Sequence, residues 1–165
     1  MKKLLIIGGA IVAVFILIVV LSNKADETKM KDNPYGTDKL SKSTIDLIGN
    51  ENYSNIVKPD DLFKKIEAGE SVTVYYFHPE CQFCMQMTPV MMPIAKEMGA
   101  DVLQYNMMEF GDLVGKGTDY EILSWPQLVH YENGEKVGSI AGYDNLNKEE
   151  SEKTIRAFFT EFEGK

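Results

Sequence analysis

Cysteine and histidine are scarce in this chain of 165 residues, which contains Cys81, Cys84, His78 and His130 and no others of either kind. A structural zinc site normally needs four ligands, often from two cysteine pairs, and a second pair is missing here. A disulfide between Cys81 and Cys84 would close a very small loop and stabilise the fold only weakly. The shortage therefore argues against a zinc domain and against a disulfide-stapled scaffold.

Basic residues are outnumbered, with 17 Lys and Arg against 25 Asp and Glu and a formal net charge of −8. The sequence has no nucleic-acid-binding motif and no stripe of basic residues, so no nucleic acid is expected as a partner. It also has no flavin or nicotinamide fingerprint, so no cofactor is expected. The acidic excess fits a well-solvated protein surface.

Charge is absent from residues 4–21, an apolar run that follows two lysines and is long enough to span a bilayer. A cleaved signal peptide is the alternative, but its apolar core is usually shorter and ends at small residues, which residues 20–25 do not offer in the right pattern. We therefore favour an uncleaved, single-pass membrane anchor. The lysines place residues 1–3 in the cytoplasm and everything from Ser22 outside it, where disulfides persist.

The outward part is expected to consist of a polar linker, residues 22–43, and one folded domain, residues 44–165. Periodicity and turn residues predict, in order, a short strand at 53–57, a helix at 59–69, a strand at 71–77, a helix at 85–98 kinked near Pro89, a strand at 102–107, a helix at 109–123, strands at 127–131 and 136–141, and a last helix from Asn147. This alternation predicts an α/β fold with a parallel strand pair, to which the Asn133-Gly134 turn adds an antiparallel hairpin. His130, within a predicted strand, is expected to be a core or face residue.

The two cysteines lie three residues apart, between the strand at 71–77 and the start of a helix. A thiol at a helix N-terminus is stabilised as thiolate by the helix dipole and by unpaired N–H groups, which lowers its pKa. Cys81 is therefore the expected nucleophile. Cys84, one turn inside the helix, is the expected resolving thiol, which attacks the Cys81 sulfur of a mixed disulfide. This placement argues against two inert thiols.

Further motifs accompany the cysteines at characteristic separations. Pro89 lies five residues after Cys84, Trp125-Pro126 precedes the predicted hairpin, and Gly142 lies eight residues after Gly134. With these motifs the chain resembles the thioredoxin family from about residue 56 to residue 162. Pro89 stands where that family has its helix-kinking proline, and Trp125-Pro126 stands where it has its cis-proline.

The resemblance implies a thioredoxin fold, in which helices flank a central mixed β-sheet, behind an N-terminal transmembrane helix, as in membrane-anchored bacterial thiol-disulfide oxidoreductases. It also implies that Cys81 attacks, that Cys84 resolves, and that the two form a redox-active disulfide. Pro126 would be cis beside the active site, and the Trp125 backbone would pair with an extended substrate segment.

Two positions depart from the family pattern. Tyr75 stands where thioredoxins have a buried Asp that helps to deprotonate the resolving cysteine, and Gln104 stands near the position of the matching Lys. Both side chains form hydrogen bonds, but neither titrates usefully near neutral pH, which puts the usual proton route in question. The dipeptide Gln82-Phe83 between the cysteines does not assign a direction to the exchange.

Two neighbours of Cys81 are candidates for tuning its reactivity. His78 would stabilise the thiolate when protonated or relay a proton; the alternative is a loop histidine that merely ends a strand. Glu80 would oppose thiolate formation if it were close, although an exposed carboxylate is well screened.

Methionines concentrate around the helix that follows the cysteines and the next strand: Met85, Met87, Met91, Met92, Met98, Met107 and Met108. The four-residue spacing of Met87 and Met91 is typical of a buried helix face, so core packing is the default. Thiolates and thioethers are also soft ligands. The alternative function is therefore a copper(I) metallochaperone that uses Cys81 and Cys84 with His78 or Met85.

The sequence thus predicts an enzyme for extracytoplasmic thiol-disulfide exchange with protein substrates, as either an oxidase or a reductase. Its expected partners are thiol- or disulfide-containing secreted or membrane proteins. Electrons must also come from or go to another protein, so a membrane redox partner is expected, either a quinone-linked oxidase or a thiol donor.

Overall fold

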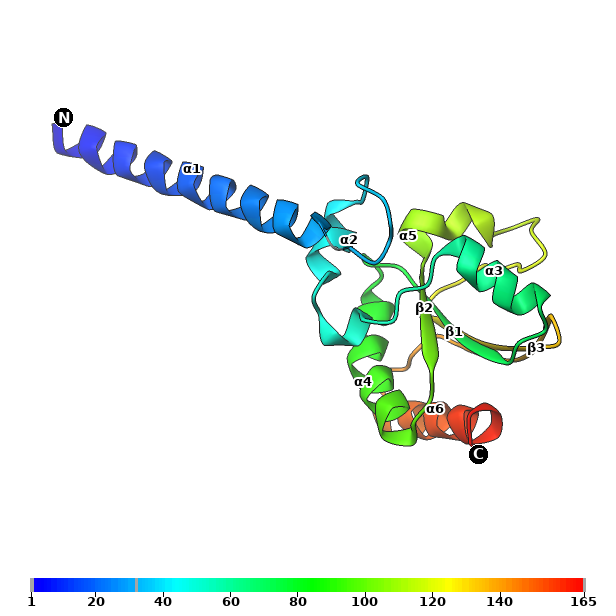
Figure 1. Cartoon of the computed structure of the whole chain (residues 1–165). Coiled ribbons are helices and arrows are strands. Elements are labelled where there is room, and N and C mark those ends of the chain that lie inside the picture. The colour runs from blue at the N-terminus through cyan, green and yellow to red at the C-terminus, as the bar shows by residue number, and fades with distance from the viewer. Residues whose placement is uncertain (1, 32, 165) are drawn as a thin grey trace. The chain divides into compact units, whose positions relative to one another are not determined.

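An apolar helix, α1 (Lys2–Lys31), dominates the first of two compact units, Met1–Asn33 and Pro34–Lys165, in the computed structural model, which describes residues 2–31 and 33–164. The stretch Ile7–Lys31 is long and apolar enough to cross a membrane, although a signal sequence near the N-terminus passes the same test. The span expected at residues 4–21 lies within this helix, coloured blue in Figure 1.

The helix continues beyond the apolar run, so the first part of the expected polar linker, residues 22–31, is helical. Adding a residue to an existing helix costs little, and this stretch is rich in good helix formers and contains no glycine or proline. The positive charges of Lys29 and Lys31 in the last turn also stabilise the helix, because they lie at the negative end of its dipole. The polar composition of residues 22–31 was therefore not a sufficient reason to predict an unstructured linker there.

The second unit begins at Pro34, earlier than the domain boundary expected at residue 44. Tyr35 is only 3% exposed and Thr44 is fully buried. The Asn106 side chain donates hydrogen bonds of 3.1 Å to the Tyr35 hydroxyl and to the Thr44 hydroxyl. Because a buried amide needs such partners, this contact holds the segment before residue 44 in the domain.

Four strands form one mixed sheet in the order β2-β1-β3-β4: β1 (Val72–Phe77), β2 (Val102–Asn106), β3 (Gln127–Glu132) and β4 (Glu135–Ala141). β1 is parallel to β2 and antiparallel to β3, and β3 and β4 form a hairpin around Asn133-Gly134. The predicted parallel pair and antiparallel hairpin are confirmed. All of β1 is buried, as is typical of a central strand covered on both faces.

The strand expected at residues 53–57 is not formed. Glu51–Tyr53 is a 3-10 helix (η1), and the segment pairs with the sheet only through an isolated bridge between Ile56 and Gln104. The 3-10 helix includes Tyr53, the first residue of the expected strand, and the next helix begins at Pro59, so only residues 54–58 are left between the two helices.

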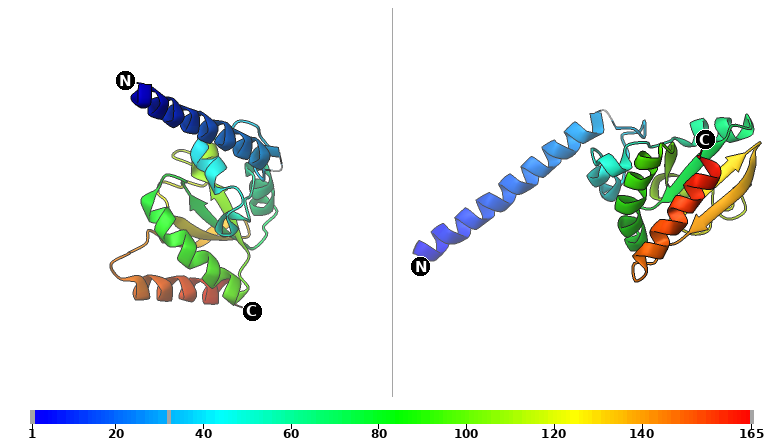
Figure 2. Two further views of the ribbon diagram at one scale, coloured as in Figure 1. Left: turned by 90° about the vertical axis from the view of Figure 1, so that its left-hand side faces the viewer. Right: turned by 90° about the horizontal axis from the view of Figure 1, so that it is seen from below.

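Helices cover both faces of the sheet (Figures 1 and 2): α4 (Gln82–Met98) and α6 (Lys148–Phe162) on one face and α3 (Pro59–Glu67) on the other. Successive side chains of a strand point to opposite faces, so β1 contributes to both hydrophobic cores. Tyr75 and Phe77 pack in the core with α4 and α6, whereas Val74 and Tyr76 pack in the core with α3.

The helix expected at residues 109–123 is mostly a loop. A short helix, α5 (Met107–Phe110), is followed by a 3-10 turn, η2 (Gly111–Leu113), and then by bends and turns. Gly117 has a φ of +83°, a left-handed conformation that favours glycine and does not continue a helix. The buried Val114 and Ile122 are joined by a backbone hydrogen bond of 2.8 Å, so their apolar character reflects a closed loop.

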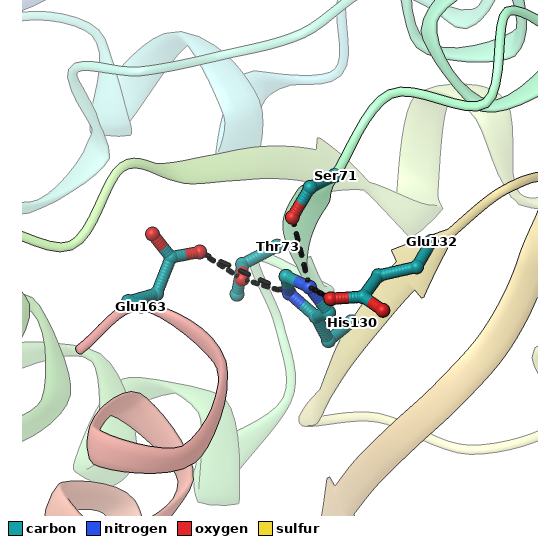
Figure 3. Close-up of polar contacts among 5 residues, drawn as sticks. All are labelled: Ser71, Thr73, His130, Glu132 and Glu163. Carbon is teal, nitrogen blue, oxygen red and sulfur yellow. Dashed lines mark hydrogen bonds and ion pairs between the residues drawn. The ribbon is translucent and has the colours of Figure 1, made fainter. Parts of the chain in front are cut away.

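His130 of β3 is fully buried, as expected, within a set of polar side chains that joins three elements (Figure 3). The Thr73 hydroxyl donates to the Glu163 carboxylate just after α6, so the Thr73 oxygen accepts from Nδ1 of His130, at 2.7 Å. Nε2 of His130 lies 3.1 Å from the Ser71 hydroxyl and 3.4 Å from Glu132. These contacts tie the end of α6 to the two central strands.

Replacing Thr73 by Val should lower the free energy of unfolding by about 1–3 kcal/mol, because the buried His130 nitrogen and the Glu163 carboxylate lose their shared partner. Denaturant unfolding of the full chain in detergent, followed by tryptophan fluorescence, measures this loss. Thr154→Val is the matched control, since it removes only an exposed hydroxyl that bonds to the Glu150 carbonyl. Equal losses in the two variants would contradict the structural role of Thr73.

Candidate active site

Cys81 lies where the chain passes from β1 into α4. After β1 ends at Phe77, the carbonyl of His78 accepts a hydrogen bond from the Cys81 N–H at 3.0 Å. Cys81 is the N-cap of α4, and its sulfur accepts a hydrogen bond from the Cys84 N–H at 3.2 Å. The sulfur therefore faces the unpaired N–H groups and the positive end of the helix dipole, which favour negative charge. Its residue is partly exposed, so the sulfur is within reach of a partner.

Cys84 is the buried member of the pair. It is fully buried and packs in the core shared by α4, α6 and one face of the sheet. Burial raises the pKa of the Cys84 thiol well above its usual range, and the hydrogen bond with Cys81 raises it further. Near neutral pH Cys84 is therefore both shielded and protonated, whereas Cys81 is accessible.

Tyr75 lies directly behind the buried cysteine. It is fully buried, and its hydroxyl is 2.9 Å from the hydroxyl of Thr88, which in turn donates a 2.7 Å hydrogen bond to the carbonyl of Cys84. The sequence analysis missed Thr88, although its position one turn after Cys84 on the same helix was a usable signal. Tyr75, which departs from the family pattern, is thus linked to the backbone of Cys84 through Thr88.

Gln104, the other departure from the family pattern, serves a different part of the domain. Its side-chain oxygen accepts from the Asn55 N–H at 3.0 Å, and its side-chain nitrogen donates to the Asn52 carbonyl at 2.7 Å. This buried amide therefore fixes the segment before α3 against β2. Tyr75 and Gln104 therefore do not pair with each other in place of the family's buried Asp and Lys, because each forms hydrogen bonds with other residues.

Trp125 and Pro126 lie beside the N-terminus of α4. The peptide bond between them is cis, and the Cys81 sulfur donates to the Trp125 carbonyl at 3.7 Å. The His78 ring stacks on the Trp125 ring, with 5.5 Å between centroids and 14° between planes. The structure therefore brings together four residues that the sequence singled out, and it shows His78 as a partner of the indole.

The side chain of Glu80 is engaged by the N-terminal part of the domain. Its carboxylate accepts a 2.5 Å hydrogen bond from the Ser43 hydroxyl in α2 (Lys42–Leu47), and its N–H donates to Nδ1 of His78 at 3.2 Å. Ser43 lies 37 residues away in sequence and carried no signal of this contact.

Four large apolar side chains on the segments that carry Cys81 and Trp125 are exposed: Phe83 is 57%, Met85 51%, Leu123 64% and Trp125 39% exposed. These side chains come from α4 and from the segment just before β3. Exposed apolar side chains on these two segments favour contact with another protein rather than with a small charged molecule.

The methionines behave mainly as core residues. Met87 and Met91 are fully buried, as the core-packing interpretation predicts, whereas Met85 is about half exposed. Within residues 2–31 and 33–164, no group of three or more His, Cys, Asp or Glu side chains is placed to hold a metal ion. The copper(I) alternative, which would add the His78 imidazole or the Met85 thioether to the two thiols, stays a prediction.

Comparison with known proteins agrees with this geometry. A sequence model of the thioredoxin family matches residues 52–157, which is more than half of the chain. The chain is similar to a mutant thioredoxin from Halobacterium salinarum, with 19% identity over 67% of this chain and 91% of that chain and a TM-score of 0.52. It is also similar to a Plasmodium falciparum thioredoxin, with 21% identity over 64% of this chain and 99% of that chain and a TM-score of 0.50.

Thioredoxin f2 from Chlamydomonas reinhardtii gives a comparable match, with 16% identity over 67% of this chain and 96% of that chain and a TM-score of 0.50. At these identities the solved structures show the shared fold alone. The family model, the mixed sheet flanked by helices and the spacing of Cys81 and Cys84 together support thiol-disulfide exchange in general terms. The chain belongs to the thioredoxin family.

Proposed function

We propose that this protein exchanges disulfides with protein substrates outside the cytoplasm, held at the membrane by α1, with Cys81 as the nucleophile and Cys84 as the resolving thiol. The main support for this proposal is that the two thiols differ in accessibility and in environment. Cys81 is accessible at the helix N-cap and accepts the Cys84 N–H, whereas Cys84 is fully buried with a raised thiol pKa. An inert or purely structural pair would need no such asymmetry.

The proposed exchange has two steps. The Cys81 thiolate attacks a substrate disulfide, forms a mixed disulfide and releases one substrate sulfur; Cys84 then attacks Cys81, forms the Cys81–Cys84 disulfide and releases the other. The substrate gains two electrons and two protons, and the cysteine pair is oxidised. The reverse sequence, starting from the Cys81–Cys84 disulfide, oxidises a substrate dithiol.

The surroundings of Cys81 favour protein substrates. The Trp125 carbonyl lies beside the Cys81 sulfur, where it can accept a backbone N–H from an extended substrate segment. Secreted or membrane proteins with thiols or disulfides are the proposed substrates. A membrane redox partner, either a quinone-linked oxidase or a thiol donor, would return the pair to its starting state, and α1 would keep the domain near it.

The reduction potential of the Cys81–Cys84 pair tests the proposal and assigns its direction. The full chain in detergent micelles would be equilibrated with glutathione buffers, with the double Cys→Ser variant as the inert control. A potential near about −120 mV would identify an oxidant, and one near about −270 mV would identify a reductant. A pair that does not cycle between dithiol and disulfide would overturn the exchange function.

Alkylation of the reduced chain should discriminate between the two thiols. At neutral pH iodoacetamide should label Cys81 at least about tenfold faster than Cys84, because only thiolates react and burial raises the Cys84 pKa. In Cys81→Ser, labelling of Cys84 should grow only as the pH rises, since its thiolate forms at alkaline pH. Mass spectrometry of peptides measures both rates, and comparable labelling at neutral pH would contradict the assigned roles.

Loss of the resolving thiol should trap the intermediate. Cys84→Ser, incubated in its reduced form with a disulfide-containing secreted protein, should accumulate a mixed disulfide through Cys81 that non-reducing gels detect. Cys81→Ser is the matched control and should form little or none, because the remaining thiol is buried. Equal trapping by the two variants would show that the nucleophile has been misassigned.

A further inference from the structure

The turn that leads from β1 to Cys81 folds back on the ring of His78. The Cys81 N–H donates to the His78 carbonyl at 3.0 Å, and the Glu80 N–H donates to Nδ1 of the His78 ring at 3.2 Å. The first bond closes the turn, and the second joins the backbone of the turn to the imidazole. The turn that presents the Cys81 sulfur therefore also orients the His78 ring.

The contact with Glu80 assigns the state of this ring. A ring nitrogen that accepts an N–H carries no proton of its own, so the proton of His78 lies on Nε2 and the ring is uncharged. A charged imidazole donates from both nitrogens and would lose this contact. The observed geometry is therefore that of a neutral ring, whereas stabilisation of a thiolate by His78 would require the charged one.

The face of the His78 ring packs on the indole of Trp125. The rings are stacked, with 5.5 Å between centroids and 14° between planes, which is the offset arrangement that aromatic rings prefer. Trp125 is 39% exposed and lies in bends at residues 124–126, before β3 begins. Burial and regular secondary structure therefore restrain this indole only weakly, and the stack with His78 is its main restraint.

The backbone of Trp125 faces the nucleophile. Its carbonyl accepts from the Cys81 sulfur at 3.7 Å, and the carbonyl of the next residue, Pro126, accepts from the Gly142 N–H at 2.9 Å. The end of β4 thus holds this segment at Pro126, whereas His78 holds it through the indole. Because side-chain and backbone rotations of one residue are coupled, the stack helps to aim the Trp125 carbonyl.

Glu80 extends these contacts into the N-terminal part of the domain. Its carboxylate accepts a 2.5 Å hydrogen bond from the Ser43 hydroxyl of α2. The next residue of α2, Thr44, is fully buried, and its hydroxyl donates to the Glu109 carboxylate at 2.6 Å. The residue whose N–H holds the His78 ring is therefore itself held by a helix that is packed into the domain.

We propose that His78 is a positioning residue for protein substrates: its uncharged ring, held by the Glu80 N–H, fixes the Trp125 indole and thereby the Trp125 carbonyl, which accepts a backbone N–H of the substrate. His78 acts on binding of the substrate backbone and not on the charge of the Cys81 sulfur. This inference rests on the proposed exchange function and names a residue that gives it a preference for polypeptide disulfides.

Two chromogenic disulfides with the same leaving group test this inference. Both are mixed disulfides of thionitrobenzoate, one with the cysteine of a short uncharged peptide and one with mercaptoethanol, which has no backbone N–H. The reduced full chain in detergent micelles would be mixed with each in a stopped-flow absorbance instrument. The released thionitrobenzoate reports attack by Cys81, so the ratio of the peptide rate constant to the mercaptoethanol rate constant measures recognition of the substrate backbone.

His78→Ala should lower this ratio by about three- to tenfold, the usual effect of weakening one uncharged hydrogen bond. His78→Asn should lower it similarly, because its side-chain oxygen still accepts the Glu80 N–H but no ring remains to stack on Trp125. His78→Phe keeps a flat ring, so its ratio should lie closer to the wild-type value than to that of His78→Ala.

Phe162→Leu is the matched control. It removes a similar stack, that of Phe162 on His130 with 4.8 Å between centroids, and His130 pairs with Thr73 near the start of β1, whereas Cys81 follows the end of this strand. The ratio should therefore stay at the wild-type value. A ratio as low as that of His78→Ala would contradict a specific role of the stack on Trp125.

An unchanged ratio in His78→Ala would overturn the inference, and so would a ratio in His78→Phe as low as that in His78→Ala. Equal slowing with the two disulfides leaves the ratio unchanged and would place the effect of His78 at the Cys81 sulfur. If His78→Ala fails to fold, an unchanged ratio in His78→Asn still overturns the inference. A wild-type chain that releases thionitrobenzoate from neither disulfide would instead overturn the exchange function.

Discussion

The complete burial of β1 is the constraint on which the active site depends. This strand is covered by α4 and α6 on one face and by α3 on the other, so no residue between Val72 and Phe77 is open to solvent. The chain first reaches the surface in the turn that follows, where α4 begins. The accessible thiol therefore lies at the first helix N-terminus after the central strand, and the second thiol, one turn later, falls back into the core.

Neutral dipoles rather than charges surround the buried thiol. A carboxylate in this position would have to be ionised in a dry environment, at a large cost in solvation, or be protonated by a shifted pKa. The phenol of Tyr75 and the hydroxyl of Thr88 avoid that cost because they are uncharged and bonded to each other.

Local signals predicted the parts of the fold that depend on local physics. The apolar run of β1, the Pro59 start of α3, the Asn133-Gly134 hairpin and the buried stripe of α6 were correctly predicted because periodicity and turn chemistry are properties of short segments. The prediction failed where tertiary packing decides. Residues 109–123 have helix-like apolar spacing but are glycine-rich and form a closed loop. The segment that begins at Pro34 was predicted to be a linker because it is polar, but Asn106 binds it to the domain through hydrogen bonds. In the site, Cys81 and Cys84 were recognisable from their spacing and position, and Trp125-Pro126 was recognisable only through the family resemblance. The Ser43–Glu80 contact carried no signal because it joins distant segments.

The position of Trp125 has a practical consequence. It is the single tryptophan of the chain, its carbonyl touches the Cys81 sulfur, and its indole stacks on His78. Indole emission from this protein therefore arises wholly within the active site, with no background from other tryptophans. Thiolates, disulfides and imidazolium groups are all effective quenchers at such short range. The chain thus carries an intrinsic fluorophore beside Cys81 and His78, in the place where an experimenter would otherwise attach a dye.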